Sequence, residues 1–142
     1  MATVGTYLNF PGNTEEAFNF YKAVFGTEFE GGIMRFKDVP TEEDKMSEVD
    51  KNLIMHVSLP ILGGHRLMGT DATEAMGFKV TFGTNIYINL EPDTREETDR
   101  LFKELSAGGK IEMAMQDMFW GDYYGSCVDK YGVKWMFNCS QK

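Results

Sequence analysis

Tyr7-Leu8-Asn9-Phe10 and Tyr87-Ile88-Asn89-Leu90 are two short segments of nearly the same sequence, 80 residues apart. Each precedes a stretch with the spacing of an amphipathic helix, 13–25 after the first and 94–107 after the second. A chain of 142 residues that carries one unit twice predicts two half-sites that face one cleft. At a spacing of 81 residues, the matching helix positions are Ala17, Phe20, Tyr21 and Val24 in the first copy and Thr98, Leu101, Phe102 and Leu105 in the second.

The ends of the two helices have recognisable capping residues. Asn13 is a suitable N-cap, and Glu16 is placed to return the hydrogen bond. Thr94 and Glu97 form the same kind of capping box before the second helix. Gly26 is expected to end the first helix in the left-handed conformation.

Alternation of apolar and polar residues predicts four strands in each unit. Gly63-Gly64 is expected to be a hairpin turn, and the polar segment 38–52 an exposed loop. The predicted strands are 4–10, 28–36, 53–59 and 65–70, followed by 85–90, 110–116, 123–128 and 133–138.

The element order is therefore βαβββ, repeated once. This order predicts an α+β fold in which two modules form curled mixed sheets around a cleft, with the helices outside. We expect one domain over 1–142, with module one at about 1–71, module two at about 84–142 and a linker at 72–83.

The strand residues that alternate with the apolar set are expected to look into the cleft. Lys134 could there pair with an anionic ligand, although a lysine in such a place more often extends to water. The expected cleft residues are Tyr7, Asn9, Asn85, Tyr87, Asn89, Lys134, Met136 and Asn138.

Composition narrows the class of partner. Apolar residues make up 42% and charged residues 25% of the chain, as in ordinary globular proteins. The net charge of −8 argues against nucleic acid or an anionic membrane as a partner. Only Cys127 and Cys139 are present, and no signal peptide or long apolar run is evident, which favours a soluble cytoplasmic protein with reduced thiols.

The repeated order, together with a set of short motifs, resembles the vicinal oxygen chelate superfamily of glyoxalases, bleomycin-resistance proteins and extradiol dioxygenases. The closer resemblance is to its PhnB-like branch, often described as 3-demethylubiquinone-9 3-methyltransferase-like. This resemblance implies a homodimer and a cleft site. The motifs are 7–10, 13–26, 54–56, 67–71, Phe119-Trp120-Gly121, Tyr124-Gly125, Asp129, Gly132 and Trp135.

In metal-dependent members of the superfamily, the first and fourth strands of each unit hold a divalent ion. Here those positions fall at Gly5 (Thr6 if the register shifts by one), Met68, Asn85 and Met136. Glycine has no ligand atom, methionine is a soft donor and asparagine is a weak neutral one, so we expect no metal cofactor at these positions. A divalent ion held by His56 with Glu112 or Asp71 stays an alternative to a histidine that is simply hydrogen-bonded within a sheet.

Two functions are compatible with these residues. The first is a metal-free protein that binds a small apolar or aromatic molecule, with Trp120 and Tyr124 either as an aromatic wall or as core residues. The alternative is a lyase, isomerase or dioxygenase-like enzyme with a non-standard metal site, or with none, in which His56 is the best candidate acid or base. A scaffold with a vestigial cleft is a third. No Gly-rich turn between a strand and a helix supports methyl transfer from a nucleotide-like cofactor.

Overall fold

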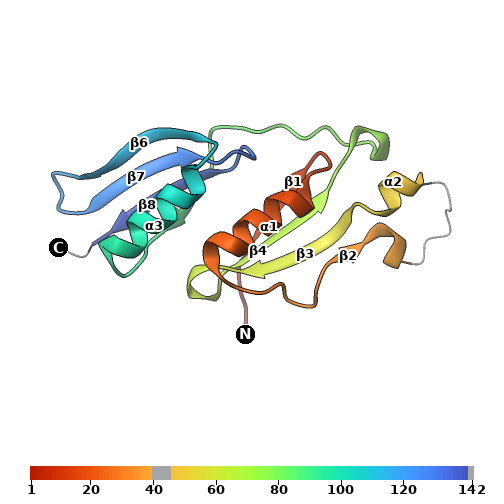
Figure 1. Ribbon diagram of the computed structural model, residues 1–142, viewed down its shortest axis with the longest axis horizontal. Helices are drawn as coiled ribbons and strands as arrows, with labels where there is room; N and C mark the ends of the chain where they lie inside the picture. The colour runs from red at the N-terminus through yellow and green to blue at the C-terminus, as the bar shows by residue number, and fades with distance from the viewer. Residues whose placement is uncertain (40–45, 141–142) are drawn as a thin grey trace. The chain divides into compact units, whose positions relative to one another are not determined.

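The computed structural model describes residues 1–39 and 46–140, which form two compact units, Met1–Thr81 and Phe82–Lys142 (Figure 1). Each unit contains one four-stranded mixed sheet and one long helix. The predicted α+β class and the repeated βαβββ order are therefore confirmed.

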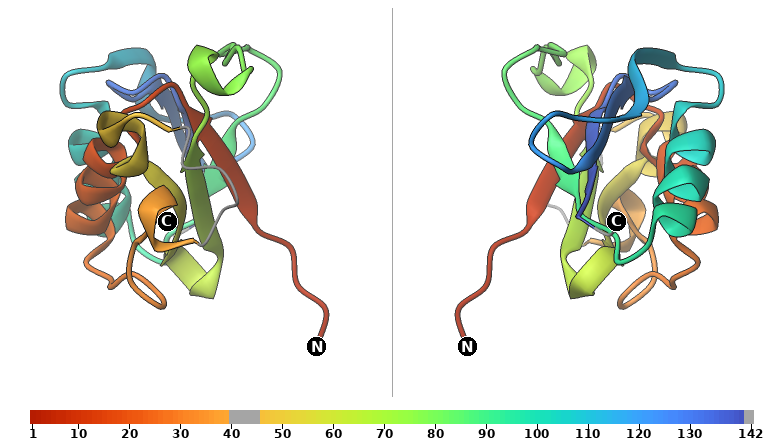
Figure 2. Two further views of the ribbon diagram at one scale, coloured as in Figure 1. Left: turned by 90° about the vertical axis from the view of Figure 1, so that its right-hand side faces the viewer. Right: turned by 90° about the vertical axis from the view of Figure 1, so that its left-hand side faces the viewer.

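Unit one has the strand order β1-β4-β3-β2, in which β1 and β4 are parallel and β3 is antiparallel to both β4 and β2. Helix α1 packs on β3 and β4 and lies on one side of the sheet (Figure 2). The elements are β1 (Thr6–Phe10), α1 (Thr14–Phe25), β2 (Met34–Arg35), η1 (Phe36–Asp38), α2 (Glu48–Lys51), β3 (Ile54–Pro60), η2 (Leu62–Gly64), β4 (Arg66–Asp71) and η3 (Glu74–Met76).

Unit two has the equivalent order β5-β8-β7-β6, with β5 parallel to β8. Helix α3 packs on β6, β7 and β8. Within the described residues, no helix has the length and apolar character needed to cross a membrane. The elements are β5 (Ile88–Leu90), α3 (Arg95–Ser106), β6 (Lys110–Asp117), β7 (Tyr123–Val128) and β8 (Lys134–Cys139).

The core of each unit lies between its helix and its sheet. In unit one, Phe18 is buried and meets both Phe10 and Tyr21 edge to face, although the helical stripe of the sequence does not include it. In unit two, Phe137 meets Phe102 of α3 edge to face. Aromatic pairs in this geometry add stability beyond the apolar area that they bury.

Several strands are shorter than the alternation predicts. By alternation, Val4 and Ile86 belong to the apolar faces of the predicted strands 4–10 and 85–90, which should pack on the helices. They lie outside β1 and β5 and are 85% and 73% exposed, so this placement is wrong. The predicted strand 28–36 is reduced to Met34–Arg35. Gly31 and Gly32 both have positive φ, and the consecutive left-handed residues turn the chain instead of extending it.

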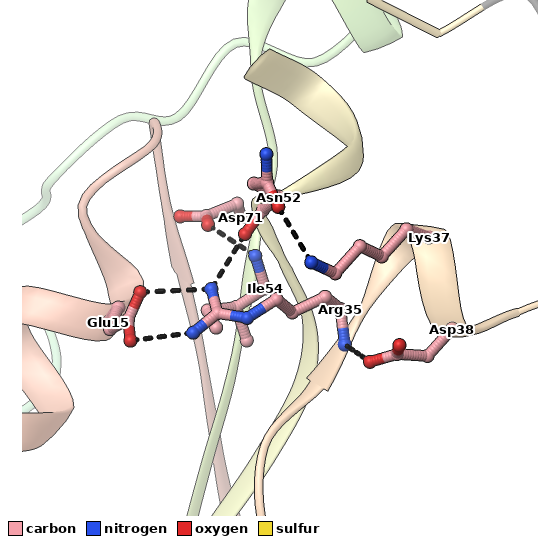
Figure 3. A network of polar contacts seen from close by, with 7 residues as sticks. All are labelled: Glu15, Arg35, Lys37, Asp38, Asn52, Ile54 and Asp71. Carbon is pink, nitrogen blue, oxygen red and sulfur yellow. Dashed lines mark hydrogen bonds and ion pairs between the residues drawn. The ribbon is translucent and has the colours of Figure 1, made fainter. Parts of the chain in front are cut away.

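The first helix is not capped as predicted. The Asn13 side chain makes no capping hydrogen bond; instead, the Asp71 carboxylate accepts from the Thr14 amide at 3.0 Å. Its other oxygen accepts from the Ile54 amide at 2.8 Å (Figure 3). The end of β4 is thereby tied to the starts of α1 and β3. The expected left-handed Gly26 at the end of the helix is confirmed.

The second helix follows its capping box in part. The Thr94 hydroxyl accepts from the Glu97 amide at 3.1 Å, as predicted. The Glu97 carboxylate, however, pairs with Arg100 along the helix, so the return bond of the box is replaced by an ion pair within one turn.

Arg35 crosslinks the polar end of unit one. Its guanidinium forms a bidentate ion pair with Glu15 of α1, at 3.0 and 2.8 Å, and also donates to the Asn52 carbonyl (Figure 3). Part of the expected loop 38–52 is helical here, because the Ser47 hydroxyl accepts from the Asp50 amide and begins α2. Positions 40–45 of that loop lie outside the described residues.

The contact between Phe18 and Gly69 predicts a strong effect of one methyl group. A Cβ at position 69 would lie 2.5 Å from the Phe18 ring, so Gly69→Ala must displace α1 from β4. We expect a loss of about 1–3 kcal/mol in the free energy of unfolding, measured by urea denaturation.

A matched control is Gly83→Ala, because a Cβ there would meet only the Asn85 side-chain oxygen at 3.4 Å. That variant should be close to wild type in stability. Equal stability of the two variants would contradict the described packing of α1 on β4.

Candidate functional site

Each sheet has one face turned away from its helix. In unit one, a Cβ at Gly69 would point at Phe18, so the neighbouring Met68 and Thr70 point to the opposite face. In unit two, Phe137 contacts α3, so Met136 points away from the helix. The open face of unit two, here called the Lys134 face, comprises Tyr87, Asn89, Glu112, Tyr124, Ser126, Lys134 and Met136.

Three side chains on the Lys134 face form a closed polar network. The Lys134 ammonium donates to Glu112 at 2.6 Å and to the Tyr87 hydroxyl at 3.3 Å. The Tyr87 hydroxyl in turn donates to the other oxygen of Glu112 at 2.8 Å. The ammonium also lies 4.8 Å from the centre of the Tyr87 ring. Tyr87 lies just before β5, Lys134 is in β8 and Glu112 is in β6, so the network spans the sheet across the intervening strand β7.

The network changes the acid–base properties of its members. Hydrogen bonds from Lys134 and then from Tyr87 hold the pKa of the Glu112 carboxyl below its usual value. The bond to Glu112 raises the pKa of Lys134 above its usual value. Both groups are therefore charged over a wider pH range than free side chains.

An aromatic group lies beside this network. The tight loop between β6 and β7 closes with a hydrogen bond from the Gly121 amide to the Met118 carbonyl, and it presents Phe119 and Trp120. Trp120 is 50% exposed and meets the Tyr124 ring at 6.3 Å between ring centres. Trp120 is thus not a core residue, whereas Trp135 is fully buried. Burial raises the pKa of Tyr124, which keeps its hydroxyl protonated.

The open face of unit one contains the candidate acid–base residue. The Tyr7 hydroxyl and His56 Nδ1 are 3.0 Å apart, and their rings are tilted against each other. A second pair lies nearby in sequence, Thr6 Oγ1 with His65 Nε2 at 2.9 Å. An imidazole held by a phenol can transfer a proton to or from a bound molecule.

The carboxylates suggested as metal partners of His56 have other contacts. Asp71 accepts from two backbone amides, and Glu112 is bonded to Lys134 and Tyr87. Over residues 1–39 and 46–140, no three side chains among His, Cys, Asp and Glu are grouped in a way that could hold a metal ion.

The metal-ligand positions implied by the resemblance hold apolar or weak donors. In unit one, a Cβ at Gly5 would lie 2.8 Å from the terminal methyl of Met68, so this methyl fills the space beside the glycine. In unit two, Met136 pairs with Asn89 across the parallel ladder, while Asn85 lies before the start of β5. This donor set does not fit a hard or borderline divalent ion.

Sequence reasoning missed the role of Glu112 and the orientation of Phe119. Glu112 lies in β6, whose pairing with β7 is interrupted by register shifts, so simple alternation could not place its side chain beside Lys134. A carboxylate and a lysine on strands of one sheet were the available signal, but β7 lies between these two strands and the register of Glu112 depends on the bulges.

This fold is the one found in solved proteins of the glyoxalase/bleomycin resistance/dioxygenase family. The model of the family described as 3-demethylubiquinone-9 3-methyltransferase matches residues 2–137, and the chain belongs to that family. Gly63-Gly64, however, lies in a turn between two antiparallel strands and does not open a helix of a nucleotide-binding unit.

Two relatives extend over nearly the whole chain. The protein YjdN from Escherichia coli is 32% identical over 139 residues, which are 93% of this chain and 91% of YjdN. The crystal structure of protein PA1353 from Pseudomonas aeruginosa has a TM-score of 0.84 and 33% identity, with both chains fully covered.

Two further structures support the branch and the fold. The PhnB protein from Bacillus cereus has a TM-score of 0.77 and 27% identity, over 97% of this chain and 99% of its own. A glyoxalase/bleomycin resistance protein/dioxygenase family enzyme from Burkholderia phytofirmans has a TM-score of 0.63 at 20% identity, over 96% and 98%, and this likeness concerns the fold alone.

The ion pair predicts a specific pH dependence of stability. The lowered pKa of Glu112 adds stability that is present above about pH 4.3, its unfolded value, and is lost as the pH falls through the folded value. Glu112→Gln should therefore be less stable than wild type at pH 7, and the difference should shrink below about pH 4.3. Urea midpoints measured from pH 7 to pH 3 test this.

Glu96→Gln, which removes an exposed carboxylate from the first turn of α3, controls for the loss of one charge. It should show a smaller difference from wild type at pH 7. A stability difference for Glu112→Gln that stays constant across the whole range would contradict the pairing of Glu112 with Lys134.

Proposed function

We propose that this protein binds a small, uncharged apolar or aromatic molecule on the Lys134 face, without a metal at the positions used by metal-dependent relatives. The observation that carries the proposal is the half-exposed Trp120, which stands against Tyr124 at the edge of this face. A flat ligand can stack on an exposed indole and gain both buried area and favourable ring contact.

The chemistry of the remaining side chains supports the same ligand class. Met136 lines the face from β8 and offers a flexible, polarisable surface to an apolar group. Asn89, which the strand pairing places opposite Met136, offers a neutral amide beside it. Aromatic rings and a thioether beside a few polar groups are the kinds of side chain that line small-molecule sites.

The donor set argues for binding without a metal. Gly5, Met68, Asn85 and Met136 supply no carboxylate or imidazole, and the methyl of Met68 fills the space beside Gly5. A Lewis-acid mechanism requires a cation held near the oxygens of the substrate. We therefore place ligand binding, and not metal-assisted turnover, first for this chain.

We also propose that the protein forms a homodimer. Strand β6 is the edge strand of its sheet and exposes Ile111 and Met113, which favours association along this edge. Native mass spectrometry should give twice the chain mass of 16.1 kDa. A particle of the single-chain mass at micromolar concentration would contradict the dimer.

Fluorescence titration with N-phenyl-1-naphthylamine, an uncharged aromatic probe, tests the binding proposal. In buffer containing EDTA, the wild-type protein should bind the probe, and Trp120→Ala should weaken binding by about tenfold. Trp120→Phe keeps an aromatic ring at this position and should retain most of the affinity.

Two results would overturn the proposal. One is binding that requires an added divalent ion. The other is equal affinity of wild type and Trp120→Ala, which would place the probe somewhere other than beside Trp120.

A further inference from the structure

The Lys134 ammonium already has an anionic partner, the Glu112 carboxylate. Its ammonium is held by Glu112 at 2.6 Å and by the Tyr87 hydroxyl at 3.3 Å, while Tyr87 and Glu112 are bonded to each other at 2.8 Å. Every contact in this ring joins a donor to an acceptor, so all three groups fix one another. The carboxylate thus stands where the anionic group of a ligand would have to bind.

The covalent tether of Glu112 makes this arrangement hard to displace. The side chain of Lys134 is only 10% exposed, and that of Glu112 is 29% exposed. An incoming anion would have to compete with a carboxylate that is covalently tethered beside the ammonium and therefore acts at high effective concentration. It would also approach Glu112 itself, and two carboxylates at one site repel each other.

An uncharged aromatic molecule meets no such obstacle. The network presents it with the Tyr87 ring and with satisfied polar groups, and it leaves Trp120 and Tyr124 available for ring contacts. Specificity of this kind comes from a repulsive element as much as from attractive contacts.

We infer that Glu112 determines the charge of the ligands accepted by the Lys134 face: it excludes anionic aromatic molecules by occupying Lys134, and it leaves the face open to neutral ones. This inference rests on the proposed function, because it concerns the same face. Glu112 is then a residue that determines ligand specificity. This role is inferred from its contacts and is not carried over from relatives.

The test uses two probes with the same ring system. N-phenyl-1-naphthylamine is neutral, and 8-anilinonaphthalene-1-sulfonate is the same molecule with a sulfonate. Fluorescence titrations give the ratio of the two dissociation constants for wild type, Glu112→Gln and the double variant Glu112→Gln/Lys134→Met. Glu96→Gln, on the helix side of unit two, is the control for net charge.

Wild type should favour the neutral probe, and Glu112→Gln should shift the ratio toward the sulfonate by about tenfold or more, since the freed ammonium can then make a charge-assisted hydrogen bond. The double variant should lose this gain, because Lys134 supplies it. A shift of the same size in Glu96→Gln or in the double variant would overturn the inference, as would an unchanged ratio in Glu112→Gln.

The two proposals can fail separately. If wild type binds neither probe, the proposed binding function is wrong for this ligand class. Sulfonate binding that appears in Glu112→Gln and disappears in the double variant would still support the role of Glu112. Binding of the neutral probe with no effect of Glu112 on the ratio would leave the proposed function standing and reject the inference.

Discussion

Two buried carboxylates hold the ends of the strands in this protein. Asp71 accepts from the amides of Thr14 and Ile54, and Asp129 accepts from two amides of its own turn and from the Trp135 indole. Both side chains are almost fully buried. A carboxylate buried without hydrogen-bond donors costs free energy. Each Asp therefore favours the one backbone arrangement that supplies these donors. Loss of one such acceptor is expected to cost about 1–3 kcal/mol.

With the strand ends fixed, each sheet has two distinct faces. The helix covers one of them, where contacts such as Phe18 against Gly69 leave no room for an added methyl group. The other face holds the paired polar side chains, Tyr7 with His56 in unit one and Tyr87 with Lys134 in unit two. In each copy of the repeat, one face of the sheet packs on the helix and the other carries the polar side chains. The two copies differ mainly in which polar side chains lie on the open face.

The sequence predicts well what is local and poorly what depends on pairing. The repeat, both long helices and the Gly63-Gly64 hairpin follow from spacing and turn chemistry, whereas the sequence left open whether Trp120 is exposed or in the core. The capping role of Asp71 was not predictable, since it joins residues that are 57 positions apart. The Lys134–Glu112 pair was missed because the bulges in β6 shift its register. Residues such as Tyr7 and Met136 stay predicted ligand contacts.

We propose above all that the Lys134 face binds a neutral aromatic molecule without a metal. The most direct measurement is a two-dimensional amide NMR titration of the protein with N-phenyl-1-naphthylamine in the presence of EDTA. We expect the largest shifts at the Trp120 indole and at the amides of Tyr124, Ser126 and Met136, with little change along α3. Shifts confined to the helices, or shifts that appear only after a divalent ion is added, would contradict this account.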